Sequence, residues 1–131
     1  MAKEKLKIAF YWAASCGGCE VAVLDVNEKI LDVIAAADIV FWPVAIDTKY
    51  KDVEAMPDKS IDACFFNGAI RTEENEKMAK LLRQKSKILV AFGSCACDGC
   101  VKGLANLWDH NDRYGMQTAP RSLLEYGCFV C

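Results

Sequence analysis

The sequence predicts an α/β fold built on an open parallel sheet. Short runs of β-branched and aromatic residues alternate with segments of helical periodicity through residue 92. The run at 87–92 is almost continuously apolar, which is typical of a strand covered by helices on both faces. Strands joined through helices form parallel sheets with right-handed crossovers. We therefore expect a flavodoxin-like open parallel sheet with helices on both faces.

Each expected strand ends at a residue that interrupts extended structure. The four strands are predicted at 7–12, 38–42, 61–67 and 87–92, and they are followed by small residues, Pro43, Gly68 and Gly93 respectively. Residues 47–60 are mostly polar and predict a surface loop with room for a short helical turn. After Gly103 the pattern weakens, and we expect irregular structure there.

Two helices are expected between these strands. Apolar residues at helical spacing predict one helix over 20–36, with an inward face of Val23, Val26, Ile30, Val33 and Ile34. A second helix is predicted from a Thr72 cap through Lys85, because acidic residues fall in its first turn and basic residues in its last.

Composition bounds the function classes. A chain of 131 residues with 53% hydrophobic residues predicts one compact domain over 1–131. The net charge of −2 gives no electrostatic footprint for nucleic acid. No apolar run approaches the roughly 20 residues of a membrane span. The charged start of the chain lacks a signal region, so we expect a cytoplasmic protein.

Eight cysteines are many for a cytosolic domain. In a reducing compartment clustered thiols are more often metal ligands or redox groups than disulfides. Cys16 and Cys19 follow the first expected strand, and Cys95 follows the last. Because the carboxyl ends of parallel strands share one edge of the sheet, these thiols are expected to meet there. Gly17 and Gly18 allow a bulky group to approach the backbone.

The ligand type alone leaves zinc, copper(I) and iron-sulfur clusters open. Zinc sites more often use two close-spaced pairs, whereas here one pair is followed by dispersed single cysteines. This dispersion favours an iron-sulfur cluster. The alternative is a structural metal site or thiol redox switch, with Cys16 and Cys19 or Cys97 and Cys100 as its dithiol.

Several motifs together resemble the small subunit of nickel-iron hydrogenases, over residues 6 to 108. The resemblance is strongest to the small (gamma) subunits of cytoplasmic, methyl-viologen-reducing hydrogenases that work with heterodisulfide reductase. It extends more distantly to the 20 kDa subunit of respiratory complex I. The motifs are Cys16-Gly17-Gly18-Cys19-Glu20, Asn67-Gly68-Ala69-Ile70-Arg71 with Glu73-Glu74, Leu89-Val90-Ala91-Phe92-Gly93-Ser94-Cys95-Ala96 and Gly103-Leu104-Ala105-Asn106-Leu107.

The resemblance implies a 4Fe-4S cluster placed against the catalytic site of a separate large subunit. Cys16, Cys19 and Cys95 match three family ligands. The fourth family ligand lies in a Gly-Cys-Pro sequence, which this chain lacks. We assign that role to Cys131 because its spacing from Cys95 resembles the family's, with Cys128 as the alternative. Longer relatives carry further cysteines in a C-terminal extension, so the chain is expected to lack that extension and to hold one cluster.

Other polar and sulfur residues have structural or functional interpretations. Cys64 is mid-strand and is expected in the core, and Trp12 and Trp42 are expected to pack at strand ends. Glu20 is either a first-turn helix carboxylate or a residue that supports the cluster or a subunit contact. For Cys97 and Cys100 three interpretations are open: they join an altered cluster, they bind a second metal, or they only occupy a loop. Arg71 either tunes the cluster or is solvated, and the only histidine, His110, is expected to be exposed.

The expected function is therefore electron transfer rather than catalysis by this chain. The subunit relays electrons to or from a nickel-iron type large subunit and exchanges them with further iron-sulfur or flavin subunits of the heterodisulfide reductase type. Whether the partner contains nickel is open at this stage, because the nickel ligands lie on the partner.

Overall fold

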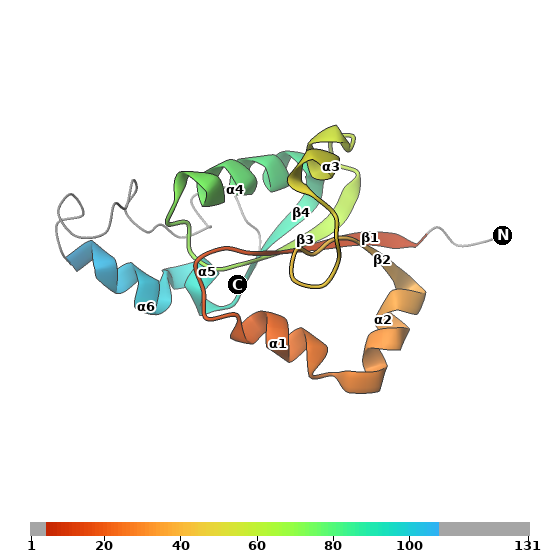
Figure 1. The fold of residues 1–131 in the computed structure, drawn as a ribbon, viewed down its shortest axis with the longest axis horizontal. Helices are drawn as coiled ribbons and strands as arrows, with labels where there is room; N and C mark the ends of the chain where they lie inside the picture. The colour runs from red at the N-terminus through yellow and green to blue at the C-terminus, as the bar shows by residue number, and fades with distance from the viewer. Residues whose placement is uncertain (1–4, 108–131) are drawn as a thin grey trace.

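A computed structural model of the chain describes residues 5–107, and within them four strands form one sheet (Figure 1). All pairings are parallel, and the order is β2-β1-β3-β4. This is the order of flavodoxin-like sheets, so the predicted fold class is confirmed. The strands are β1 (Leu6–Trp12), β2 (Ala37–Phe41), β3 (Ile61–Asn67) and β4 (Ser86–Phe92).

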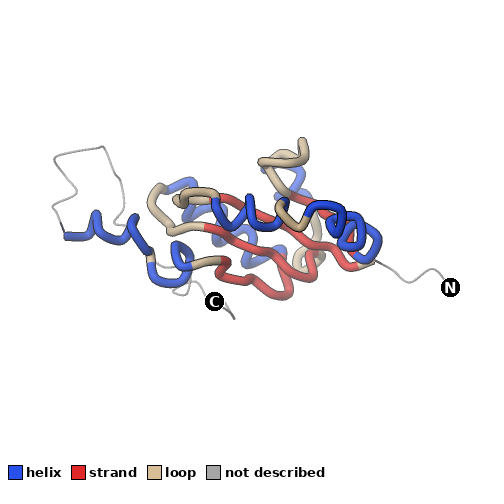
Figure 2. Tube along the Cα trace, turned by 90° about the horizontal axis from the view of Figure 1, so that it is seen from below, coloured by secondary structure: helices blue, strands red, loops and turns tan. Residues whose placement is uncertain are grey.

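Helices cover both faces of the sheet. In Figure 1, α3 and α4 lie on one side of the strands and α1 and α2 on the other, and Figure 2 shows the strands side by side in a single layer. None of the helices in the described part of the chain is long and apolar enough to cross a bilayer. The helical elements are α1 (Gly18–Leu24), η1 (Asn27–Lys29), α2 (Ile30–Ala36), α3 (Tyr50–Ala55), α4 (Glu73–Lys85), α5 (Ser94–Asp98), α6 (Cys100–Gly103) and η2 (Leu104–Leu107).

The prediction of one continuous helix over 20–36 is wrong. The segment breaks into α1, the 3₁₀ turn η1 and α2, because Asn27 takes a left-handed conformation with φ 50°. Asparagine tolerates that region better than most residues. The broken segment does not bury its apolar face: Val26 is 42% exposed and Ile34 46%. Local periodicity identified the helical turns but not the kink between them.

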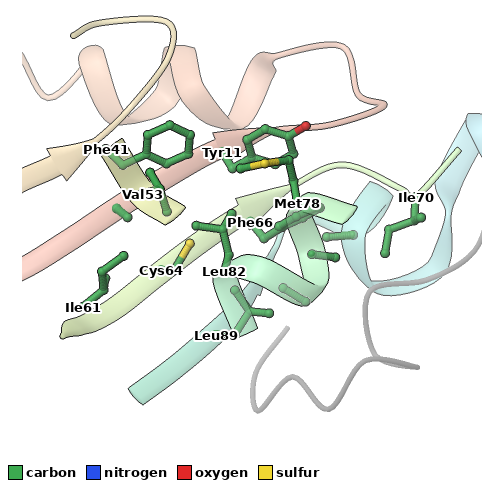
Figure 3. Packing of buried hydrophobic residues seen from close by; sticks show 14 of the residues in the cluster. Tyr11, Phe41, Val53, Ile61, Cys64, Phe66, Ile70, Met78, Leu82 and Leu89 are labelled. Atoms are coloured by element: carbon green, nitrogen blue, oxygen red, sulfur yellow. The ribbon is translucent and has the colours of Figure 1, made fainter. Parts of the chain in front are cut away.

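The main core lies between the sheet and α3–α4. Figure 3 shows Tyr11, Phe41 and Phe66 of three strands packed with residues of α3 and α4. Cys64 belongs to this cluster and is fully buried, as predicted. The Thr72 cap is also confirmed, because its Oγ1 accepts a hydrogen bond of 3.2 Å from the Asn75 backbone N–H.

The opposite face of the sheet carries a row of aromatic rings. Phe92 contacts Phe65, Phe65 contacts Phe10, and Phe10 contacts Trp42, with centroid distances of 5.9, 5.1 and 4.5 Å. The row runs from β4 across β3 and β1 to the end of β2. Trp42 is almost completely buried, as predicted for a packing residue. It connects the aromatic row to the cysteine-bearing edge of the sheet.

Candidate metal centre

The register of the sheet brings three cysteine-bearing or polar loops to one edge. Trp12 of β1 pairs with Asn67 of β3, and Asn67 pairs with Phe92 of β4. The segments that follow these residues therefore leave the sheet at the same level. Crossovers on opposite faces diverge at this point, which is where ligands bind in open α/β sheets.

Hydrogen bonds shape the loop after β1 around Cys16. The Ser15 Oγ accepts a bond of 3.1 Å from the Gly17 N–H, and the Cys16 Sγ accepts one of 3.4 Å from the Gly18 N–H. Trp12, which is 40% exposed, donates its indole N–H to the Ser15 carbonyl at 3.2 Å. The prediction that Trp12 packs at the strand end holds in part, because its ring covers this loop while one side faces solvent.

The loops after β1 and β3 lie directly against each other. Ala14 and Ala69 form an antiparallel bridge, with N–H to carbonyl distances of 3.1 and 3.0 Å. Gly68 permits this approach, since a Cβ on it would lie 2.8 Å from the Ala13 backbone and its φ is +110°. The loop that carries Cys16 is thus hydrogen-bonded to the loop after β3.

The loop after β4 meets the start of α1 at Gly93. A Cβ on Gly93 would overlap the Cys19 Sγ, far inside van der Waals contact, and the φ of Gly93 is +86°. The Cys19 thiol therefore lies against the backbone of Gly93, two residues before Cys95. Glycine is the residue type that allows both the close approach and the left-handed backbone. Residues distant in sequence meet here, as the strand topology predicted.

Cys16 contributes to the raised pKa of both Cys19 and Cys95. Burial raises the pKa of the Cys19 thiol, and Cys16 and Glu20 raise it further. Burial also raises the pKa of Cys95, where Cys100 and Cys16 add to the rise and Lys102 opposes it. Cys16 is exposed and Cys19 and Cys95 are half-buried, so the three predicted ligands stand at the surface of the edge.

Glu20 is a buried carboxylate next to this group of thiols. It is 2% exposed, and its Oε2 accepts a hydrogen bond from the Trp42 indole N–H. Burial raises the pKa of Glu20 while Trp42 and Asn67 lower it. Glu20 lies in the first turn of α1, as the first interpretation predicted, and it directly follows Cys19 in the sequence. Sequence reasoning missed the partnership with Trp42.

The structure separates Cys97 from Cys100. Cys97 is buried in the core cluster, whereas Cys100 is exposed at the junction of α5 and α6. The Ser94 side chain and the Val101 backbone lower the pKa of the Cys100 thiol. Cys97 is also not among the free cysteines of the described residues, whereas Cys100 is, so the two do not form the free dithiol of the alternative interpretation. Their spacing in the sequence gave no signal of this difference.

The remaining predicted residues are placed as follows. Arg71 is half-buried in the segment after β3, where its backbone N–H contacts the Asn75 side chain at 3.3 Å. Cys128, Cys131 and His110 lie outside the described residues. Over 5–107, no three His, Cys, Asp or Glu side chains are gathered closely enough to hold a single metal ion.

The donor chemistry of this edge fits an iron-sulfur cluster. Thiolates are the usual ligands of such clusters, and three thiols reach this edge from its first and last loops. Gly93 has no side chain, and the Cys19 thiol occupies the space that a side chain there would fill. A cluster also spreads its thiolates over several iron atoms, so its ligands need not crowd around one point.

The comparison with protein families identifies the family to which the chain belongs. The family model described as "NADH ubiquinone oxidoreductase, 20 Kd subunit" matches residues 16–125. The chain belongs to this family. The matched range includes Cys16, Cys19 and Cys95, together with the loops that bring them together.

Curated relatives of this family member are named as hydrogenase subunits. The chain is 47% identical to the iron-sulfur subunit of the F420-non-reducing hydrogenase of Archaeoglobus profundus, over 83% of the chain and 34% of that protein. It is 39% identical to the corresponding F420-non-reducing hydrogenase protein of Methanothermobacter thermautotrophicus, over the same shares. The chain therefore spans about one third of the length of these relatives.

Solved structures agree on the fold. A chain of the NAD+-reducing [NiFe]-hydrogenase in the H2-reduced state superposes with a TM-score of 0.70 at 22% identity, over 91% of this chain and 68% of that one. A chain of the Ni-Fe-Se hydrogenase from Desulfomicrobium baculatum gives a TM-score of 0.65 at 19% identity, over 94% and 51%. At these identities the likeness shows a common fold.

Proposed function

We propose that this chain is an electron-transfer subunit of a hydrogenase-like oxidoreductase complex and carries one 4Fe-4S cluster. One observation carries the proposal: the Cys19 thiol, three residues after Cys16, lies against Gly93, two residues before Cys95. Membership of the 20 Kd subunit family supports it. The name of the Archaeoglobus profundus relative, an iron-sulfur subunit, supports the class of cofactor.

The proposed ligands are Cys16, Cys19 and Cys95, with Cys131 as the fourth and Cys128 as its alternative. Ligating cysteines are deprotonated, and iron offsets the cost of burying their charge. Burial raises the pKa of Cys19 and of Cys95, so deprotonating either thiol carries a desolvation cost of this kind. The Gly18 N–H already points at the Cys16 sulfur, and hydrogen bonds of this kind tune cluster potentials.

The bound cluster would supply one-electron chemistry, and the chain's residues would hold and shield it. Trp12 covers the loop before Cys16, and the Glu20–Trp42 hydrogen bond fixes the first turn of α1 beneath Cys19. Residues that orient metal ligands in this way are often as important as the ligands themselves. Catalysis is assigned to the partner.

The proposed partner is a hydrogenase-like large subunit, and further iron-sulfur or flavin subunits of the heterodisulfide reductase type complete the electron path. Exposed apolar side chains on α1, which directly follows the cysteine loop, and on α2 support a covered face: Val21, Leu24, Leu31 and Ile34. Contiguous exposed apolar residues mark interaction surfaces. We place the complex in the cytoplasm, where clustered thiols stay reduced.

The proposal is tested on the full chain and on its native complex, both purified without oxygen. We expect about four iron and four sulfide per chain, with an EPR signal after dithionite reduction. Nickel and a large subunit should accompany the chain in the complex. A large subunit without nickel would still support the relay but would place the chain in a hydrogenase-derived complex. Zinc without sulfide would contradict the relay and favour a structural metal site or a redox switch.

A further inference from the structure

A cavity of about 340 Å³ lies at the amino ends of the strands, opposite the edge that carries the thiols. Its walls come from the first residues of β1, β3 and β4 and from residues just before them. Figure 1 shows β1 beginning at one end of the molecule and α5 and α6 at the other. A strand of seven residues spans roughly 20 Å, so the length of the sheet separates this cavity from the thiols. The polar lining residues are Lys5, Lys7, Lys59, Ser60, Asp62 and Lys87.

The lining of this cavity is positively charged in a chain that is negative as a whole. Four lysines and one aspartate give the lining a formal charge of +3, whereas the whole chain carries −2. A hollow lined by charges of one sign raises the local concentration of ions of the opposite sign. The composition of the cavity therefore favours an anion.

The aspartate of the lining is already engaged by neighbouring donors. Asp62 Oδ1 accepts a hydrogen bond of 2.6 Å from the Lys87 ammonium, and Oδ2 accepts one of 2.8 Å from the Lys7 backbone N–H. These two hydrogen bonds lower the pKa of the Asp62 carboxyl. The charges of Asp62 and Lys87 therefore offset each other, and the other three lysines carry the excess positive charge.

Lys59 is held in a fixed position against the end of α4. Its Nζ donates to the carbonyls of Arg83 and Ser86 at 3.1 and 3.0 Å. An ammonium group has three N–H donors, so a third donor is left for a ligand. The backbone of Lys59 has a φ of +57°, a left-handed conformation that lysine seldom adopts. Strain of this kind persists where the surrounding structure enforces it, and it is concentrated at functional sites.

Two further groups of the lining are suited to an anion. Lys7 is exposed and takes part in none of the ion pairs found within residues 5–107. Ser60 Oγ is buried and has no hydrogen-bond partner in the same part of the chain. Buried hydroxyl groups normally have a partner, so an unpaired one needs an explanation. Lys5 is less available, because it donates to the Ile34 carbonyl at 2.8 Å and lies 3.5 Å from the exposed Asp38 carboxylate.

We propose that this cavity binds a small ligand through a phosphate group that carries at least two negative charges. Lysine binds phosphate as a point charge, and a hydroxyl donates to a phosphate oxygen. The volume falls within the range of small-molecule sites, about 300–1,000 Å³, so a nucleotide or a pyrophosphate suits it better than a single phosphate ion. The inference goes beyond the proposed function and does not depend on it, because none of these residues is a proposed cluster ligand.

The test measures phosphate binding by the full chain, purified without oxygen. The wild type is titrated calorimetrically with inorganic phosphate, pyrophosphate and ADP at constant ionic strength, and thermal unfolding is followed with each ligand. The variants are Lys7→Gln and Ser60→Ala. The control is Lys51→Gln, which removes the same charge from an exposed position on α3 outside the lining. Circular dichroism checks that each variant folds.

We expect pyrophosphate and ADP to bind the wild type and to raise its unfolding temperature, with inorganic phosphate binding more weakly. Lys7→Gln should weaken binding about fivefold, the order expected for one solvent-exposed charge contact, and Lys51→Gln should match the wild type. Ser60→Ala should weaken binding without lowering the unfolding temperature, because the hydroxyl that it removes has no partner. Tighter binding of ADP than of pyrophosphate would identify a nucleotide as the ligand, and equal binding would assign recognition to the phosphates alone.

Three results would overturn the inference. The first is the absence of both heat and a change in unfolding temperature with all three phosphate ligands. The second is equal weakening by Lys51→Gln and Lys7→Gln, which would show only a general attraction to the chain. The third is tighter binding of a poly-glutamate peptide than of pyrophosphate, which would assign the cavity to an acidic segment of a protein partner. Iron and sulfide are measured on the same samples, so failure of the proposed function is detected separately from failure of phosphate binding.

Discussion

At Gly93 the segment that follows β1 and carries Cys19 contacts the segment that follows β4 and carries Cys95. Its missing side chain leaves the space that the Cys19 sulfur occupies. The Cys19 thiol lies against the backbone of Gly93, two residues before Cys95. A site built from loops far apart in sequence depends on such contacts.

Gly93→Ala is expected to reduce the iron content of the purified chain. The new Cβ would overlap the Cys19 Sγ, and alanine disfavours a φ of +86°, so Cys19 or the β4–α5 turn must move. We expect a loss of stability of about 1–3 kcal/mol from the backbone alone. The control is Gly103→Ala, where the nearest atom outside the helix lies at an ordinary 3.6 Å. Equal iron in both variants would contradict the role given to Gly93.

Glu20 illustrates how one buried group serves two elements. Its carboxylate lies at the start of α1 and accepts a hydrogen bond from Trp42 at the end of β2. Its second oxygen, Oε1, has no hydrogen-bond partner within the described chain. The hydrogen bond and the burial together hold the segment that carries Cys19.

Glu20→Ala is expected to destabilise the chain by about 1–3 kcal/mol, because it leaves the buried Trp42 N–H without an acceptor. Glu20→Gln keeps an acceptor of the same length and should cost less. Urea denaturation, monitored by tryptophan fluorescence, measures the free energy of unfolding of both variants. If the two variants are equally unstable, the hydrogen bond is not the stabilising contact.

At the scale of elements, α4 is the best-anchored helix and the α1–α2 segment the least buried. The α4 helix begins at a satisfied cap and contributes Met78, Ala79 and Leu82 to the core. It also packs beside Tyr11 of β1, whose hydroxyl accepts a bond of 3.5 Å from the Asn75 amide. Because the Tyr11 hydroxyl is buried, its ionisation makes the stability of the fold depend on pH in the alkaline range.

Stability is expected to fall as the pH rises above about 10. Burial raises the pKa of Tyr11 above its usual value of 10.0. The folded chain therefore keeps a proton that the unfolded chain releases, and each further rise in pH favours unfolding. Tyr11→Phe should lose less stability than the wild type between pH ~9 and ~11 in urea titrations. An identical loss in both proteins would show that Tyr11 does not control this transition.

At the scale of the whole molecule, the two faces of the sheet differ in coverage. The α3–α4 side has a closed core, whereas the α1–α2 side exposes Val21, Leu24 and Leu31. The more exposed side adjoins the cysteine loop through α1. This asymmetry fits a subunit whose second face is completed by another chain.

Replacing Val21 and Leu24 together by Gln is expected to reduce recovery of the large subunit with this chain at least tenfold. The substitution removes apolar area from the face proposed to be covered, without adding charge near the thiols. Leu6→Gln is the control, since Leu6 is 58% exposed but lies at the opposite end of β1. Co-purification under anaerobic conditions measures the effect. Full recovery with the double variant would place the partner elsewhere.

The sequence by itself determined the strands, the capped helix and the edge of the sheet from which the cysteine-bearing segments leave. These features follow from local rules: β-branched runs define strands, Thr72 begins a helix, and parallel strands share one carboxyl edge. The buried position of Cys64 was predictable for the same reason. The roles of Cys128 and Cys131 stay predictions, since both lie outside the described residues.

Only the tertiary structure decided which contacts complete the site. The break at Asn27, the Glu20–Trp42 pair and the seat of Cys19 on Gly93 depend on how elements pack, which no local pattern encodes. Packing also separated Cys97, in the core, from Cys100, beside Cys95. The two cysteines are close in sequence, but the Cys97 side chain points into the core and the Cys100 thiol lies at the surface.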